Sequence, residues 1–253
     1  MMKYVVVVVC LMIGLFCSSV YAAIPLITDD TGTQGKGKFQ LELSGEYGHD
    51  KEESVTNKNS DFSAALTYGG VDSLDIVLSI PYQIWHAEET GCKTKGDGIS
   101  DIAIEAKWRF YEKEGLSFAL KPGFTIPTGD DEKDLGNGKM TYYIYFIGSK
   151  EIKPWSFHLN LAYIRNDNTW DDRKDIWHAS FASTVDLKKD LKLVGDVGVE
   201  TNPGCGSTNL PVYILGGVIY TVRENFDIGL GIKGGLTEPE SDISARGGIA
   251  YRF

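Results

Sequence analysis

The chain has 253 residues and carries 35 acidic against 25 basic residues, which gives a formal net charge of −10. An acidic chain without a basic cluster binds nucleic acid poorly, so we expect no nucleic-acid partner. Aromatic residues make up 11 % of the chain, and glycine is frequent, with 29 residues. This composition suits a β-barrel in a membrane, because only every second strand residue must be apolar to face lipid.

The first 22 residues predict a secretory signal peptide that is cleaved near Ala22. Lys3 precedes the apolar run 5–16, and Val20 and Ala22 occupy the two small-residue positions of a cleavage site. The run is shorter than the roughly 20 residues of a membrane-spanning helix, and it is the longest apolar run in the chain. We therefore expect an exported protein without a membrane-spanning helix.

The mature chain is predicted to open with an irregular segment followed by a barrel domain. Residues 23–38 contain Pro25, Gly32, Gly35 and Gly37, too many breakers for a regular element. We expect these residues to form a periplasmic lead-in. Residues 39–253 follow as the outer-membrane barrel.

Alternation of apolar and polar residues predicts twelve strands in the barrel domain. They are expected at 39–47, 62–68, 74–82, 102–110, 116–126, 141–148, 155–163, 177–185, 192–200, 213–220, 226–233 and 242–253. In the segment 141–148 both faces are apolar, so the alternation does not say which face meets lipid. Polar stretches such as 49–58 and 85–97 are expected to be loops. Glycines cluster in the last three strands, where we interpret them as bends or relief of crowding.

The predicted connections alternate between long polar loops and turns of a few residues. An outer-membrane barrel shows this asymmetry, with the long loops outside the cell. A soluble β-sandwich would give the same strand alternation without it. We therefore predict an all-β fold, an antiparallel up-and-down transmembrane β-barrel of about 12 strands in the bacterial outer membrane, surrounded by lipid. The five tryptophans fall near strand ends, as interfacial girdles require: Trp85, Trp108, Trp155, Trp170 and Trp177.

The last predicted strand is a second indication of an outer-membrane barrel. Ile243, Ala245, Ile249, Tyr251 and Phe253 share one face of an amphipathic strand on which the sequence finishes. This pattern resembles the signal by which bacterial outer-membrane proteins are recognised by the barrel assembly machinery. We expect that machinery to be a partner.

Inward-facing positions of the predicted strands carry charges of both signs. The candidate lumen-lining residues are Glu42, Glu46, Glu105, Lys107, Arg109, Lys121, His158, Asn160, Asp196, Glu200, Lys233, Arg246 and Arg252, with His178 and Asp227 at equivalent positions. Unpaired charges are costly in a narrow barrel, so many of these groups must pair or contact water. Two interpretations stay open: a ladder of ion pairs that fills the lumen, or a solute path lined by the same groups.

Other site chemistry finds little support in the sequence. His158 or His178 could act as the base of a hydrolase with Ser156 or Ser180, but no Gly-x-Ser-x-Gly motif is present. The acidic loop 130–134 lacks the spacing of an EF-hand calcium loop. We therefore predict no catalytic residues, no metal site and no cofactor.

Two cysteines, Cys92 and Cys205, remain after removal of the signal peptide, and both lie in predicted outer loops. An exported chain with two cysteines favours a disulfide between them. Such a bridge requires Cα atoms within about 7 Å of each other.

Two motifs resemble those of a known family. Residues 25–33 read PLITDDTGT and lead through GKGKF into the first strand, and residues 123–130 read GFTIPTGD. Together with the closing strand they resemble the Putative MetA-pathway of phenol degradation family of outer-membrane barrels. The resemblance implies a transport or porin-like role, in some members linked to uptake of aromatic compounds, and it supplies no set of binding residues.

We therefore predict an outer-membrane channel or transporter for small solutes, including aromatic or hydrophobic ones, and not an enzyme. The alternative is a structural or adhesive barrel with a closed lumen that acts through its outer loops. A barrel that hydrolyses lipid is the third hypothesis.

Overall fold

A computed structural model describes residues 24–52, 55–89 and 92–253, and the predicted signal peptide lies outside this described part. The fold is built of antiparallel strands: β1 (Phe39–Glu52), β2 (Val55–Val71), β3 (Leu74–Glu89), β4 (Cys92–Ile99), β5 (Ile102–Lys113), β6 (Leu116–Ile126), β7 (Tyr142–Ile152), β8 (Trp155–Arg165), β9 (Asp175–Lys188), β10 (Leu191–Glu200), β11 (Val212–Arg223), β12 (Phe226–Gly235) and β13 (Ile243–Arg252). A short 3-10 turn, η1, covers Asp131–Lys133. Among the described residues, no helix is long and apolar enough to cross a membrane.

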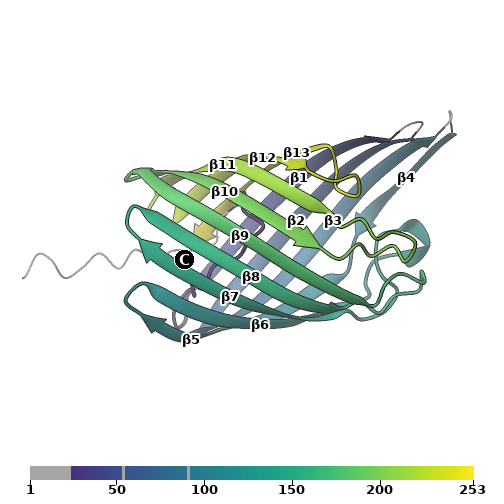
Figure 1. Cartoon of the computed structure of the whole chain (residues 1–253). Coiled ribbons are helices and arrows are strands. Elements are labelled where there is room, and N and C mark those ends of the chain that lie inside the picture. Colours follow the sequence, from purple (N-terminus) through teal and green to yellow (C-terminus); the bar gives the residue numbers. More distant parts are fainter. Residues whose placement is uncertain (1–23, 53–54, 90–91) are drawn as a thin grey trace, which may run out of the picture.

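The sheet closes on itself into a barrel (Figure 1). β1 pairs with both β2 and β13, so the first and last strands are neighbours. β3 pairs with β5 along one half of its length and with β4 along the other half. β4 and β5 therefore share one position in the ring, and the barrel has twelve strand positions. This confirms the predicted antiparallel barrel of about 12 strands.

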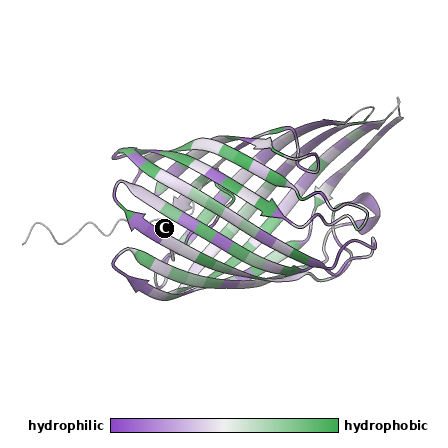
Figure 2. Cartoon of the chain, viewed as in Figure 1, coloured by the Kyte–Doolittle hydropathy of each residue, from purple (hydrophilic) through white to green (hydrophobic). Residues whose placement is uncertain are grey.

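The outer wall of the barrel is apolar, because every second strand residue points away from the lumen. Leu230 and Ile232 on β12 are 60 % and 55 % exposed, and their neighbours Asp227 and Lys233 of opposite parity are buried inside. Figure 2 shows hydrophobic residues along the middle of the strands and hydrophilic residues toward the outer ends. Large apolar side chains with this much exposed surface are expected where lipid covers the barrel wall.

Aromatic rings border this apolar surface. Phe39 stacks on Phe253 with ring centroids 5.6 Å apart at the tight-turn end, and Tyr163 contacts Trp177 at 5.0 Å near the opposite end. Trp85 and Trp170 depart from the expected girdle. Their indole nitrogens donate to the carbonyls of Lys133 and Gly136 in a loop outside the barrel, because the segments that carry them extend beyond the rim.

The two ends of the barrel differ as the sequence predicts. Turns of two residues join β2 to β3, β5 to β6, β7 to β8, β9 to β10 and β11 to β12. At the other end, the described residues of the expected loops 49–58 and 85–97 instead extend the strands, and Figure 1 shows β1 to β4 projecting beyond the rim. Both faces of these extensions meet water, so the alternation that identifies a strand is absent there.

Candidate functional site

The lumen of the barrel is occupied by the chain itself. Residues 24–38, here called the luminal segment, run along the inside of the wall (Figure 1), and Thr28 and Asp30 are only 1 % and 2 % exposed. We expected this segment to lie outside the barrel as a periplasmic lead-in. It lies inside because side chains of the wall supply the hydrogen bonds that its irregular backbone needs.

The central anchor of the luminal segment is Asp29. One carboxylate oxygen lies 2.9 Å from Lys107 Nζ on β5, and the other lies 2.9 Å from Lys121 Nζ on β6. Asn160 on β8 holds the backbone of the same residue, accepting from its N–H at 2.8 Å and donating to its carbonyl at 2.7 Å. Burial alone would raise the pKa of Asp29, but the two ammonium groups outweigh it and hold the pKa well below its usual range.

A second anchor lies across the lumen at Asp196 on β10. Its carboxylate accepts hydrogen bonds from the backbone N–H groups of Ile27 and Thr28 at 2.7 and 2.8 Å and from the Thr28 hydroxyl at 2.6 Å. The Tyr213 hydroxyl donates to the same carboxylate at 3.3 Å. These donors satisfy the hydrogen-bonding capacity of this buried carboxylate and fix the backbone of the luminal segment to β10.

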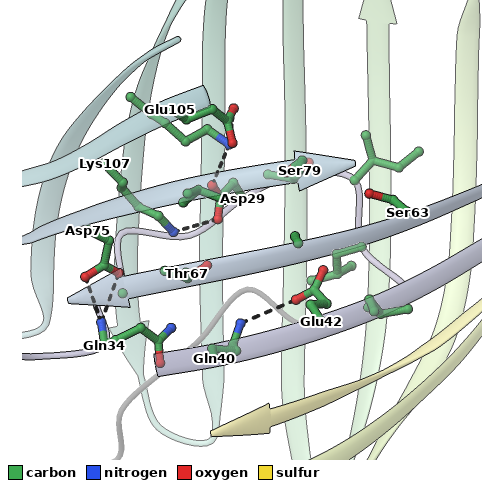
Figure 3. A pocket seen from close by; sticks show the side chains of 18 residues that line it. Asp29, Gln34, Gln40, Glu42, Ser63, Thr67, Asp75, Ser79, Glu105 and Lys107 are labelled. Atoms are coloured by element: carbon green, nitrogen blue, oxygen red, sulfur yellow. Dashed lines mark hydrogen bonds and ion pairs between the residues drawn. The ribbon is translucent and has the colours of Figure 1, made fainter. Parts of the chain in front are cut away.

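Further wall contacts hold the two ends of the luminal segment. Arg246 Nε on β13 donates to the carbonyl of Pro25 at 3.0 Å. At the other end the N–H of Gln34 donates to Asp75 on β3 at 2.9 Å. Figure 3 shows the Asp29 and Gln34 contacts side by side on one wall of the lumen. The segment is thus tied to strands on several sides of the barrel.

Glycines of the last three strands make room for the start of the luminal segment. A Cβ on Gly231 would lie 2.8 Å from Cγ of Pro25, and a Cβ on Gly229 would overlap the carbonyl of Ile24. We interpreted these glycines from the sequence as bends or relief of crowding. Their inward positions permit close approach of the segment backbone to the wall.

The candidate lumen residues all lie on strands, and most are joined in pairs. Glu46 contacts Lys233 at 2.8 Å and also pairs with Arg246. The other contacts are Lys121 with Glu105 at 3.4 Å, Arg252 with Asp227, Arg109 with Glu112 at 3.2 Å, His178 with Glu200 at 3.1 Å, His158 with Ser149 at 2.9 Å and Gln40 with Glu42 at 3.4 Å. Lys107, Asn160 and Asp196 bind the luminal segment.

The two histidines do not converge on a common nucleophile. His158 lies opposite Ala182 in the β8–β9 pairing, while His178 lies opposite Ala162, four residues along the strand. At about 3.3 Å per residue this separates the two rings by roughly 13 Å along the barrel. Each ring is instead held by its own partner in the wall.

Cys205 is a free, exposed thiol, and its Sγ lies 3.1 Å from the carbonyl of Asp171. The expected bridge to Cys92 is therefore not formed at Cys205 in this structure. The side chain of Cys92 lies outside the described part. Within that part, no cluster of three or more His, Cys, Asp or Glu side chains could hold a metal ion.

Three cavities follow one another through the barrel. The outer cavity, about 680 Å³, lies between the loops and is lined by Asp101, Asn137 and Thr141, among others. The middle cavity, about 400 Å³, shares Asn137 and Thr141 with it. The inner cavity, about 250 Å³, shares Ile27, Asp29, Glu105 and Lys121 with the middle one (Figure 3). The residues common to the last two cavities form the partition between them.

Sequence reasoning missed Tyr143 and Tyr145, which point into the middle cavity from β7. The strand that carries them is apolar on both faces, so alternation gave no direction. It also missed Asp29 and Asp75. The adjacent acids Asp29 and Asp30 in a segment otherwise short of charge were the available signal for the first of these.

Solved structures share this fold at low sequence identity. The COG4313 outer membrane channel from Pseudomonas putida F1 has a TM-score of 0.71 and 12 % identity, with 94 % of this chain and 100 % of that chain covered. The KdgM porin has a TM-score of 0.57 and 9 % identity, covering 85 % and 99 %. The translocator domain of autotransporter NalP from Neisseria meningitidis has a TM-score of 0.52 and 12 % identity, covering 87 % and 89 %. Channels and a translocator share the fold, so the likeness defines the architecture alone.

The sequence matches no curated protein. The sequence model of one family, described as Putative MetA-pathway of phenol degradation, matches residues 24–253. That range begins with the luminal segment and continues through the closing strand, so it includes the anchors described above as well as the wall. The chain therefore belongs to the Putative MetA-pathway of phenol degradation family.

Proposed function

We propose that this protein is an outer-membrane channel for small solutes that combine an aromatic ring with a polar group, and that the luminal segment closes it. The observation that carries this proposal is the series of three cavities, which share lining residues from the outer loops to Asp29. A barrel with a purely structural role has no need of successive cavities inside its wall.

The lining of the middle cavity fits such a solute. Tyr143 and Tyr145 supply aromatic surface, and Ile164 and Ile176 supply apolar surface. Glu105, Lys121, Asn160 and Glu200 in the same lining offer donors and acceptors for hydroxyl or carboxyl groups. Ligand sites commonly combine apolar walls with a few polar groups that fix the orientation of the ligand.

The relatives support the same class of function and location. Two of the similar structures are an outer membrane channel and a porin, and the family description refers to phenol degradation. The exposed apolar wall and the expected signal peptide fit an outer-membrane location. We propose a channel rather than an enzyme, since His158 and His178 are apart and each is held by a wall residue.

The luminal segment itself favours the second candidate function, a closed barrel that acts through its outer loops. Anchors at Asp29, Asp196 and Arg246 could hold the segment in place permanently. The extended strands β1 to β4 would then present the functional surface. The two functions differ in whether solute ever crosses the barrel.

Liposome swelling separates them. The purified barrel and a variant lacking residues 24–34 are each reconstituted and tested with a small sugar and a phenol-like solute of similar mass. Uptake by the intact protein establishes a channel, and faster uptake of the aromatic solute supports the proposed selectivity. Uptake by the deletion variant alone means that the segment holds the channel closed. Absence of uptake by both, with a heat-modifiable folded band on gels, refutes the channel and leaves the closed barrel.

A further inference from the structure

The contact between Asp29 and the wall has the chemistry of a carboxylate receptor. Each of the two carboxylate oxygens has its own ammonium group at 2.9 Å, Lys107 on one side and Lys121 on the other. The two lysines come from adjacent strands of the rigid wall, whereas Asp29 comes from the luminal segment. The wall therefore presents a fixed pair of cations, and the segment supplies the anion.

The luminal segment provides most of the oxygen atoms that these cations contact. Besides Asp29, Lys107 Nζ contacts the carbonyl of Asp30 at 3.1 Å and its carboxylate at 4.0 Å. Lys121 has one carboxylate partner on the wall, Glu105 at 3.4 Å. When Asp29 and Asp30 withdraw, Glu105 is the one carboxylate of the described part of the chain that stays within ion-pair distance of either ammonium group. An incompletely neutralised pair of buried cations favours binding of another anion.

The other acids of the inner cavity are engaged elsewhere. Asp75 accepts the backbone N–H of Gln34 at 2.9 Å, and Glu42 accepts from the side-chain amide of Gln40 at 3.4 Å. Both line the cavity that contains Lys107 and Lys121. Asp75 and Glu42 therefore affect the electrostatic potential around the lysine pair, while Asp29, Asp30 and Glu105 contact the two ammonium groups directly.

Aromatic surface adjoins the lysine pair on the side that leads outward. The ring of Tyr145 lies 5.2 Å from Lys121 Nζ, and Tyr143 meets Tyr145 edge to face at 5.9 Å. Both rings line the middle cavity together with Lys121. A ligand whose carboxylate reaches Lys121 from the outer side would place an attached aromatic ring against the tyrosines.

We propose that Lys107 and Lys121 form a binding site for small aromatic carboxylates inside the channel, and that Asp29 occupies this site as an internal competitor. This inference rests on the proposed channel function and names a solute class for it. An incoming carboxylate takes the two ammonium contacts of Asp29. Because Asp29 lines both the middle and the inner cavity, its departure opens the partition between them.

Calorimetric titration of the purified protein in detergent micelles tests the site, with benzoate as the anionic probe and benzyl alcohol as its neutral counterpart. Asp29→Asn removes the competing charge and retains the size of the side chain, so benzoate should bind about tenfold more tightly or better. Lys121→Met should weaken benzoate binding at least about tenfold. Benzyl alcohol should respond to neither substitution.

Lys233→Met is the matched control. It removes one luminal ammonium group that pairs with Glu46 and Glu240, each at 2.8 Å, away from the lysine pair. Benzoate affinity should be unchanged in this variant. That result would show that benzoate binds at the lysine pair and does not merely respond to the overall electrostatic potential of the lumen. A heat-modifiable band on gels verifies the fold of each variant.

Two results would overturn the inference: equal benzoate affinity in the wild type and Asp29→Asn, or equal losses in Lys121→Met and Lys233→Met. The outcome is independent of the swelling assay. If phenol-like solutes enter liposomes but benzoate shows no dependence on Asp29, the channel stands and the carboxylate site is wrong. If no solute enters while benzoate binds as expected, the site stands and the transport function is wrong.

Discussion

Gly229→Ala tests whether the wall is shaped for the luminal segment. The new methyl group would overlap the carbonyl of Ile24, and a carbon atom approaches a carbonyl oxygen no closer than about 3.3 Å. Strand β12 is held on both edges by β11 and β13, so the segment must move by more than roughly 1 Å. The next carbonyl, that of Pro25, moves with it and loses its 3.0 Å bond from Arg246.

The size of the effect follows from that bond. A hydrogen bond from a charged donor contributes about 1.5 to 3 kcal/mol, so the undocked fraction of the segment should rise about tenfold or more. Single-channel recording in planar bilayers should show a corresponding rise in open probability. Gly216→Ala is the matched control on the neighbouring strand, because a Cβ there meets nothing within 4 Å. Identical open probabilities for wild type, Gly229→Ala and Gly216→Ala would refute the reasoning.

Three further predictions concern charge and thiol chemistry. Burial raises the pKa of Asp30 from 3.8 to about 7. Because the docked form retains the proton, docking of the luminal segment should weaken as pH rises from about 4 to 7. The open probability of the channel should therefore rise from pH 5 to pH 8, and this rise should vanish in Asp30→Asn. Glu46→Gln removes the carboxylate that Arg246 and Lys233 share, while Lys233 keeps its contact with Glu240. It should cost about 3 kcal/mol in urea unfolding, whereas Glu112→Gln, 60 % exposed, should cost less than about 1 kcal/mol; equal losses would contradict the buried pairing. Cys205 should react with maleimide in native protein without reductant, and labelling only after reduction would restore the expected disulfide.

The barrel wall was predictable because its two faces meet different solvents. Leu41 and Leu43 point to lipid while Glu42 and Glu46 point inward, so β1 shows its period in the sequence. The prediction failed where that contrast disappears. Tyr143 and Tyr145 give β7 an apolar inner face, and the extensions of β1 to β4 have water on both sides.

The luminal segment was not predictable from local pattern, because its structure is determined by partners distant in sequence. Asp29 is fixed by Lys107, Lys121 and Asn160. Of these partners, Lys107 lies 78 residues away in the sequence and Asn160 lies 131 residues away. Alternation assigns those three partners to inward positions, but it gives no sign of what they bind. The candidate site could thus be half predicted: the wall residues were found, and the segment that joins them was not.

The glycines beside Ile24 and Pro25 also impose an order of assembly. The luminal segment precedes the first strand in the chain, yet part of its docking surface belongs to β12 and β13, which are synthesised long after it. That surface does not exist until the C-terminal strands have joined the sheet and β13 has paired with β1. Closure of the ring must therefore precede full docking of the segment. A barrel arrested before its final hairpin would be leaky, and insertion of the last two strands would be the step that seals the membrane.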